Sequence, residues 1–184
     1  MKIAVLLACG FEEAEALFTT DIFRRANIKT DLVSINAEKT VVGSHNIKVV
    51  ADCLLDDKIY DYDVIVLPGG LPGATNLRDD KRVIEVIKHF YKNDKYIGAI
   101  CAAPIVLAKA DIIKGKNITS YPGFEDDLKE GNYLEDKVVV DGKIVTARGP
   151  AITMDFAFKI IELLGYDASK LKEGMLYNML MQTK

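Results

Sequence analysis

Short apolar runs alternate with longer amphipathic stretches along this chain, and that alternation restricts the fold more than any other feature. Residues 3–8 and 63–67 are apolar enough to form strands that are buried on both faces. Residues 12–26 and 80–91 carry apolar side chains at helical spacing. Strands and helices in alternation predict an α/β protein, with a mostly parallel central sheet and helices on both of its faces.

The other expected elements continue this pattern. Turn-forming residues at 43–46 and the Asp141-Gly142 pair each predict a hairpin. A length of 184 residues fits one domain over residues 1–184. Further strands are expected at 29–35 and 96–100, hairpins at 39–42 with 47–51 and at 137–140 with 144–147, and helices at 102–110, 151–164 and 171–181.

Charge and cysteine content argue against several classes of protein. The net charge is -3, whereas a protein that binds nucleic acid directly usually has a basic surplus. The first apolar run is too short for a secretory signal or a membrane span. Three widely spaced cysteines, Cys9, Cys53 and Cys101, suit free thiols in a reducing compartment such as the cytoplasm. Their spacing does not favour a metal site, and no cofactor is expected.

Cys101 lies where a predicted strand runs directly into a predicted helix. Small residues flank it, and Pro104 suits a first helical turn. A helix start favours the thiolate, which is the nucleophilic form of cysteine. The alternative is a small buried thiol that fills the core. We expect a reactive Cys101, whereas Cys9 is expected to fill a turn and Cys53 to lie at the surface or an interface.

Parallel strands bring their carboxyl ends to one edge of a sheet, so neighbouring strand ends suggest partners for Cys101. Glu15 follows the first strand, and a protonated Glu15 would stabilise a nearby thiolate, whereas an ionised one would oppose it. Gly69 and Gly70 offer backbone N–H groups after another strand, or form only a turn. Arg148 could bind an acidic substrate group, or form a structural ion pair.

The chain has two histidines, either of which could activate a thiol if it lay close. His89 is expected on the polar face of its helix, in solvent. His45 is expected in an exposed hairpin turn, from which it could reach a partner subunit's site. Neither is expected near Cys101 within one subunit.

These segments together resemble the ThiJ/PfpI superfamily, and within it the DJ-1-like branch. The resemblance runs over nearly the full length and is specific because four motifs occur in one order. They are Gly10-Phe11-Glu12-Glu13-Ala14-Glu15, Val66-Leu67-Pro68-Gly69-Gly70, Ala99-Ile100-Cys101-Ala102-Ala103-Pro104, and Thr146-Ala147-Arg148-Gly149-Pro150.

The resemblance implies a flavodoxin-like three-layer sandwich, similar to class I glutamine amidotransferase domains, and a homodimer. It implies that Cys101 is the nucleophile and that Glu15 is its protonated partner. The N–H groups of Gly70 and Ala102 would face an oxyanion. One position departs from the pattern: Tyr121 stands where better-studied members have a histidine. Because tyrosine is a poor base at neutral pH, this departure disfavours peptidase activity.

Two functions follow from the resemblance. The first is a deglycase or glyoxalase that acts on methylglyoxal, glyoxal or their early adducts on proteins or nucleotides, and releases a hydroxy acid. The second is a redox sensor or chaperone of oxidative stress, in which Cys101 oxidises to a sulfinate. A role linked to thiamine thiazole biosynthesis is a weaker alternative.

Overall fold

The computed structural model describes residues 1–181, and its centre is a seven-stranded sheet in the order β10-β11-β7-β6-β1-β2-β5. All neighbouring strands are parallel except β10 and β11, which form an antiparallel hairpin. The strands are β1 (Lys2–Leu7), β2 (Lys29–Ser34), β5 (Cys53–Leu54), β6 (Val64–Leu67), β7 (Tyr96–Ile100), β10 (Val138–Asp141) and β11 (Ile144–Ala147).

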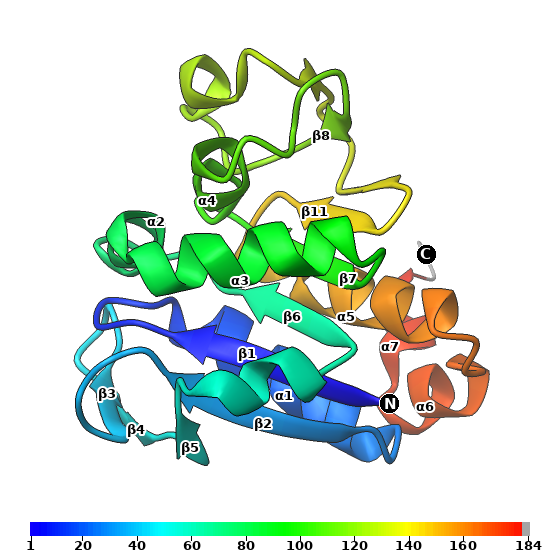
Figure 1. Ribbon diagram of the computed structural model, residues 1–184. Coiled ribbons are helices and arrows are strands. Elements are labelled where there is room, and N and C mark those ends of the chain that lie inside the picture. The colour runs from blue at the N-terminus through cyan, green and yellow to red at the C-terminus, as the bar shows by residue number, and fades with distance from the viewer. Residues whose placement is uncertain (182–184) are drawn as a thin grey trace.

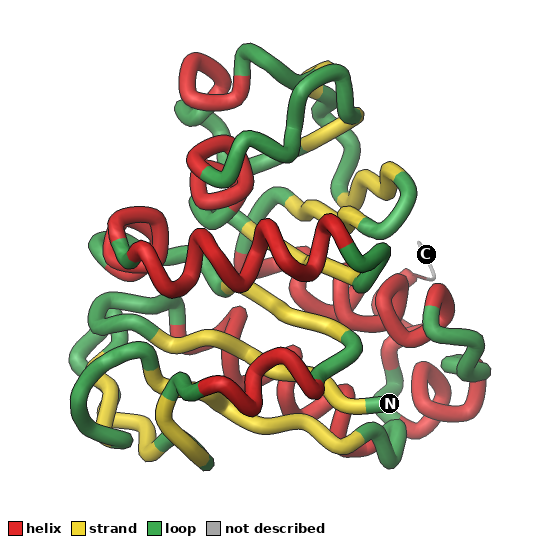
Figure 2. The backbone as a smooth tube through the Cα atoms, viewed as in Figure 1, coloured by secondary structure: helices red, strands yellow, loops and turns green. Residues whose placement is uncertain are grey.

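Helices cover both faces of this sheet, which confirms the predicted three-layer sandwich (Figure 1). Strand β1 shows why, because its alternate side chains enter two separate cores: Ala4 and Leu6 face one, Val5 and Leu7 the other. The first core is closed by α2 (Gly73–Asp79), α3 (Lys81–Lys92) and α4 (Pro104–Lys109). The second is closed by α1 (Glu13–Arg25) and α5 (Thr153–Leu163). Figure 2 shows the strands lying between these two layers of helices.

Two small sheets lie outside the central one. The hairpin predicted around residues 43–46 is present as β3 (Thr40–Val42) and β4 (Lys48–Val50), which pair in antiparallel register. A second pair, β8 (Asn117–Ile118) with β9 (Asn132–Tyr133), was not expected, because two-residue strands leave no periodic signal. Short 3₁₀ turns complete the chain: η1 (Asp57–Asp61), η2 (Glu125–Leu128) and η3 (Pro150–Ile152).

Two predicted helices differ from the structure. The helix expected at 102–110 begins only at Pro104, because residues 101–103 form the turn that follows β7. The single helix expected at 171–181 is wrong, since two short helices occupy this region. They are α6 (Ser169–Gly174) and α7 (Tyr177–Met181). The break lies at Leu176, whose φ of 58° cannot continue a right-handed helix.

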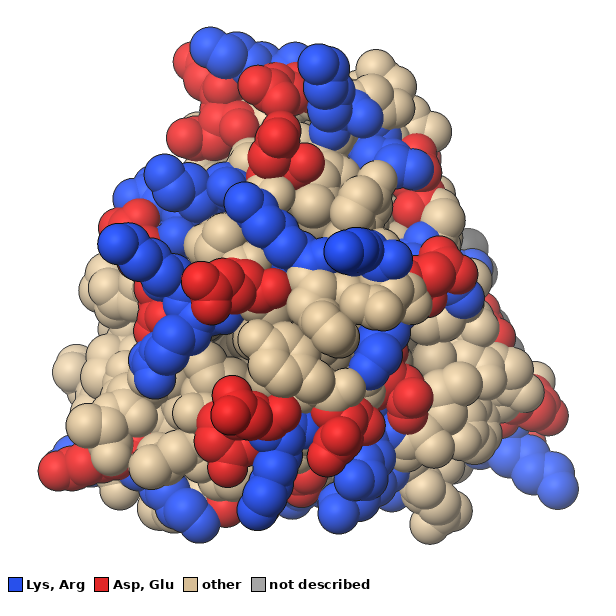
Figure 3. All heavy atoms as spheres, viewed as in Figure 1, with Lys and Arg blue, Asp and Glu red and all other residues tan. Residues whose placement is uncertain are grey.

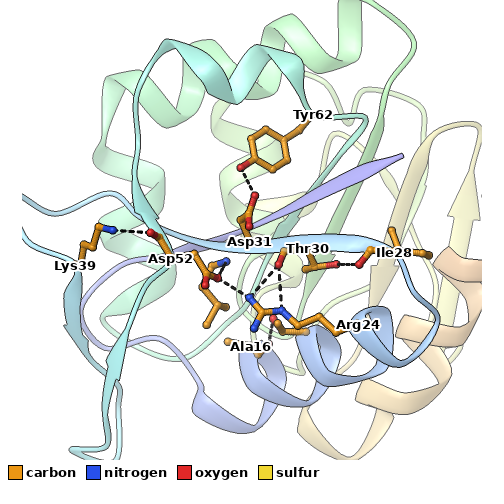
Figure 4. A network of polar contacts seen from close by, with 10 residues as sticks. Ala16, Arg24, Ile28, Thr30, Asp31, Lys39, Asp52 and Tyr62 are labelled. Carbon is orange, nitrogen blue, oxygen red and sulfur yellow. Dashed lines mark hydrogen bonds and ion pairs between the residues drawn. The ribbon is translucent and has the colours of Figure 1, made fainter.

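A polar network fastens the β2–β5 edge of the sheet to α1 (Figure 4). The Arg24 guanidinium donates to the carbonyl of Thr30 and forms a 2.6 Å ion pair with Asp52. The same Asp52 carboxylate accepts the N–H of Leu32 at 2.8 Å. Since Asp52 immediately precedes β5, this network holds the short edge strand in place. Cys53 itself is a residue of β5 and is partly buried.

The described helices and surface fit the composition. None of the helices within residues 1–181 has the length and apolar character needed to span a bilayer. On the face that Figure 3 shows, Lys and Arg side chains are interspersed with Asp and Glu.

Candidate functional site

The backbone at Cys101 adopts an unusual conformation, with a φ of 64°. Only a few per cent of non-glycine residues have positive φ, and this strain is typical of functional sites. Two hydrogen bonds hold the conformation: the N–H of Cys101 donates to the carbonyl of Ala147 at 2.9 Å, and the N–H of Tyr121 donates to the carbonyl of Cys101 at 2.9 Å. The predicted sharp strand-to-helix turn is therefore present, and its cysteine is 9% exposed.

Glu15 lies beside Cys101, deep in the protein. Its side chain comes from the first turns of α1 and is 1% exposed. One carboxyl oxygen accepts the N–H of Gly69 at 2.7 Å, whereas Oε1 has no hydrogen-bond partner among the described residues. Burial raises the pKa of Glu15 to about 7, a rise that its contacts with Gly69 and Cys101 limit. A carboxyl with this pKa can both donate and accept a proton near neutral pH.

Gly69 makes this juxtaposition possible. A Cβ atom at this position would lie 2.6 Å from Cβ of Cys101 and 2.9 Å from Oε2 of Glu15. Any side chain at Gly69 would therefore push the two reacting groups apart. Gly70 has a φ of 82°, which glycine adopts without strain. The predicted glycine loop is thus a spacer between Cys101 and Glu15.

The thiol of Cys101 does not have the lowered pKa that its position in the sequence suggested. Burial raises the pKa of the thiol to about 12, and the charge of Glu15 adds to this effect. The backbone N–H groups of Gly70 and Ala102 oppose the rise by donating to the sulfur. Once the pair has lost its first proton near pH 7, these pKa values place the remaining proton mainly on the sulfur, and a thiolate forms in the minor state in which that proton lies on Glu15.

Tyr121 and Arg148 differ in how close they come to this pair. The backbone of Tyr121 is bonded to Cys101, and its ring is 49% exposed. The absence of a side chain at Gly149 leaves room for this ring, since a Cβ there would lie 3.2 Å from Tyr121 Cδ2. Arg148 donates from Nη1 to the carbonyl of Glu135 at 3.0 Å. This contact is a hydrogen bond to the main chain and not the structural ion pair that the sequence offered as the alternative, and a substrate-binding role for Arg148 stays a prediction.

The structure brings His45 to the start of α1, 32 residues away in sequence. Its Nδ1 lies 2.9 Å from Glu13 Oε2 and 3.7 Å from Glu12 Oε2. This contact could not be predicted from the sequence, because the spacing of residues does not show where the β3–β4 hairpin folds back onto α1. His89 also departs from its prediction: it is partly buried, with its ring centroid 4.6 Å from that of Tyr60.

Glu12, Glu13 and His45 form a cluster that could in principle hold a divalent cation. One ligand atom from each lies within 4.8 Å of the others. However, Glu13 already accepts the backbone N–H groups of His45 and Ile47, at 2.8 and 3.4 Å. These bonds fasten the hairpin turn to α1 and explain the arrangement without an ion.

Comparisons with known proteins agree with the fold that holds this site. Protein DJ-1alpha of Drosophila melanogaster is 42% identical over 171 residues, which cover 90% of this chain and 79% of that protein. The crystal structure of DJ-1beta from the same organism has a TM-score of 0.91 at 37% identity, over 95% of this chain and 97% of the other. An oxidized DJ-1 of Toxoplasma gondii has a TM-score of 0.89 at 34% identity, over the same shares of the two chains.

The sequence profile of the DJ-1/PfpI family matches residues 1–163, a stretch that includes Glu15, Gly69, Gly70, Cys101 and Tyr121. Together with relatives above 30% identity that align along most of their length, this match identifies the chain as a member of the DJ-1/PfpI family.

Proposed function

We propose that this protein is a cofactor-independent enzyme that converts methylglyoxal or glyoxal, free or as early adducts, into a hydroxy acid. One observation carries the proposal: a strained cysteine lies against a buried carboxyl whose pKa is about 7. A carboxyl with this proton affinity can exchange a proton with the sulfur and with a substrate at neutral pH. Membership of the DJ-1/PfpI family is compatible with this activity.

The proposed reaction starts when the proton of the pair lies on Glu15. The Cys101 thiolate adds to the aldehyde carbon of methylglyoxal, and the carbonyl oxygen takes the proton of Glu15, which gives a hemithioacetal. In an early adduct the thiolate displaces the amine instead, and the amine leaves with that proton. Since Gly70 and Ala102 direct N–H groups to the sulfur, they stabilise the thiolate before attack and again when it is released.

The Glu15 carboxylate then removes the proton from the former aldehyde carbon while the neighbouring ketone oxygen takes up a proton, which gives an enediol. The former ketone carbon next receives a proton, and the hydroxyl on the former aldehyde carbon loses one. This shift moves a pair of electrons within the substrate and leaves a thioester of lactate on Cys101. Water hydrolyses the thioester and restores the thiol. The net change is methylglyoxal plus water to lactate, so no external oxidant or reductant is needed.

The test is lactate formation from methylglyoxal by purified wild type, Cys101→Ala and Cys9→Ala. Cys9 is an exposed thiol and serves as the matched control. We expect the Cys101→Ala variant to lose activity by at least 100-fold, whereas Cys9→Ala keeps it. Equal rates for wild type and Cys101→Ala would exclude Cys101 from the reaction.

A second candidate function is redox sensing through Cys101. The unpartnered Oε1 of Glu15 and the N–H groups of Gly70 and Ala102 could hold the oxygens of a sulfinate. The oxidized structure of the Toxoplasma gondii relative gives further support. Mass spectrometry after mild peroxide treatment decides this, because Cys101 should gain two oxygens before Cys9 or Cys53 does.

The homodimer stays a prediction of the resemblance, and the cytoplasmic location a prediction of the cysteine content. Light scattering of the purified chain would measure the first, and microscopy of the tagged protein the second.

A further inference from the structure

The loops around Cys101 hold only two charged side chains. The segments that follow β1, β6, β7 and β11, at residues 8–12, 68–72, 101–103 and 148–152, contain one glutamate, one arginine and no lysine. The arginine is Arg148, whose guanidinium donates to the carbonyl of Glu135. Backbone hydrogen bonds lower the pKa of the Glu125 carboxylate, and the charge of Arg148 adds to this effect, so an acidic neighbour counters part of that charge.

Glu12 supplies the negative charge closest to the reacting pair among these loops. Its backbone N–H donates to the carbonyl of Gly69 at 2.9 Å, which places it against the glycine loop. Its side chain is 16% exposed, so the carboxylate reaches solvent at the edge of the site. The charge of Glu12 also adds to the burial that raises the pKa of Glu15. An electric field from Glu12 thus reaches the carboxyl that interacts with Cys101.

His45 only partly compensates this field. Its ring lies 2.9 Å from the Glu13 carboxylate and 3.7 Å from that of Glu12. One imidazolium faces two carboxylates, so the cluster keeps a net negative charge even when His45 is protonated. The backbone of Tyr121 is bonded to Cys101, and its half-exposed ring offers an aromatic surface, which attracts cations and repels anions at its face.

We infer that this site selects its substrates by charge, favouring dicarbonyl adducts whose remaining part is neutral or positive over adducts that carry phosphate. Adducts on amines and guanidines belong to the favoured class, and adducts on nucleotides to the disfavoured one. The substrate names rest on the proposed function. The charge selectivity itself is a property of the surroundings of Cys101 and can be measured without turnover.

The first test uses two methanethiosulfonates that differ in charge, the 2-(trimethylammonium)ethyl and the 2-sulfonatoethyl reagent. The Cys101 thiolate attacks the sulfenyl sulfur, forms a disulfide and releases methanesulfinate. Both rates are measured at low salt in a Cys9→Ser/Cys53→Ser background and are divided by the rates with 2-mercaptoethanol. We expect the cationic reagent to be favoured about tenfold or more, because a unit charge at this range changes a rate several-fold. A normalised ratio of one or less would overturn the inference.

Two variants assign the effect to Glu12. Glu12→Gln should lower the ratio about threefold, since it removes one negative charge beside the glycine loop. Glu173→Gln changes the net charge by the same amount but lies on α6, at the opposite end of the sheet from the glycine loop (Figure 1). It should leave the ratio unchanged. An equal decrease of the ratio in both variants would mean that the net charge of the protein, and not the charge at Glu12, causes the selectivity.

The second test compares substrates that share one reacting group. Guanosine and guanosine 5′-triphosphate are treated with methylglyoxal to form the adducts. The release of guanosine or guanosine 5′-triphosphate from its adduct is then followed at low salt. We expect kcat/KM to be at least tenfold higher for the guanosine adduct, and the difference to shrink with added salt. Equal values with an active enzyme would refute the charge selectivity, whereas absence of Cys101-dependent lactate formation from methylglyoxal would refute the proposed function alone.

Discussion

Two glutamates on the first turns of α1, Glu13 and Glu15, both have low exposed fractions, yet their pKa values are shifted in opposite directions. Their exposed fractions are 4% and 1%. The pKa of Glu13 is lowered to about 2, whereas that of Glu15 is raised to about 7. The two residues share a helix and a low exposed fraction, but Glu15 lies much deeper in the protein than Glu13, so the difference comes both from depth of burial and from what each carboxylate contacts.

Hydrogen bonds add to this difference in depth. Burial acts on both carboxylates in the same direction, but Glu13 receives donors from the β3–β4 hairpin: the ring and the backbone N–H of His45, the N–H of Ile47 and the hydroxyl of Ser44. Glu15 receives the N–H of Gly69, and its Oε1 is left without a partner. A buried carboxylate that accepts several hydrogen bonds stabilises the folded structure. One that accepts few has a raised pKa and can take part in proton transfer near neutral pH.

The largest expected difference between the two glutamates is in activity. Glu15→Gln should lower lactate formation from methylglyoxal by a factor of about 10² to 10⁴, because a positioned proton donor is lost. Glu13→Gln should change it less than about threefold at temperatures where the variant is folded. Both variants differ from wild type by one oxygen-to-nitrogen exchange, so they control for each other. Similar losses of activity in the two variants would mean that Glu13 and Glu15 do not differ in function.

For stability we expect the opposite order: Glu13→Gln should destabilise the protein more than Glu15→Gln. Glu13→Gln replaces charge-assisted hydrogen bonds and should lower the free energy of unfolding by about 2 kcal/mol at pH 7. The deficit should shrink as the pH falls from 4.5 towards 2, since a carboxylate with a lowered pKa loses its stabilising effect when it is protonated. Urea unfolding at several pH values measures this.

The pKa of Glu15 is raised, so protonation of Glu15 favours folding below pH 4.5, and this benefit is lost as the pH rises through about 7. At pH 8 the Glu15→Gln variant should therefore be at least as stable as wild type. A marked loss of stability at pH 8 would show that Glu15 holds the fold together, as Glu13 does.

A smaller effect is expected on the pH profile of Cys101 alkylation. In wild type the Cys101–Glu15 pair should lose its first proton near pH 7, and the rate with iodoacetamide should rise there. Glu15→Gln should remove this step and leave a single rise at alkaline pH, set by a thiol whose pKa is lower than in wild type because the charge of Glu15 is gone. Glu13→Gln should keep the wild-type profile. A step near pH 7 that survives in Glu15→Gln would belong to another group.

The smallest effect concerns His45. Replacing it by Asn removes the ring that faces Glu13 but keeps the backbone N–H bond to the same carboxylate. The loss of stability should be small, in line with an exposed ion pair. Thermal unfolding at low and high salt would measure it, and salt should reduce the wild-type advantage. A loss as large as that of Glu13→Gln would mean that the ring, and not the backbone, holds the hairpin.

Much of the architecture could be predicted because it depends on local periodicity. The buried strands, both hairpins and the turn at Cys101 follow from apolar runs and turn residues. The proton affinities could not be predicted: the sequence placed Cys101 at a helix start, but burial and the charge of Glu15 act more strongly on its thiol. The contact between His45 and Glu13 depends on how a hairpin folds back over α1, and the break at Leu176 depends on one backbone angle.

Main-chain atoms hold Cys101, and this has a consequence for how such a site can diverge. The peptide groups of Cys101 are bonded to the backbone of Ala147 and of Tyr121. The half-exposed side chain at position 121 can therefore be exchanged without releasing the cysteine from its strained turn. A lineage could replace a histidine with a tyrosine at residue 121, and so retune the chemistry, while inheriting the same sulfur in the same place.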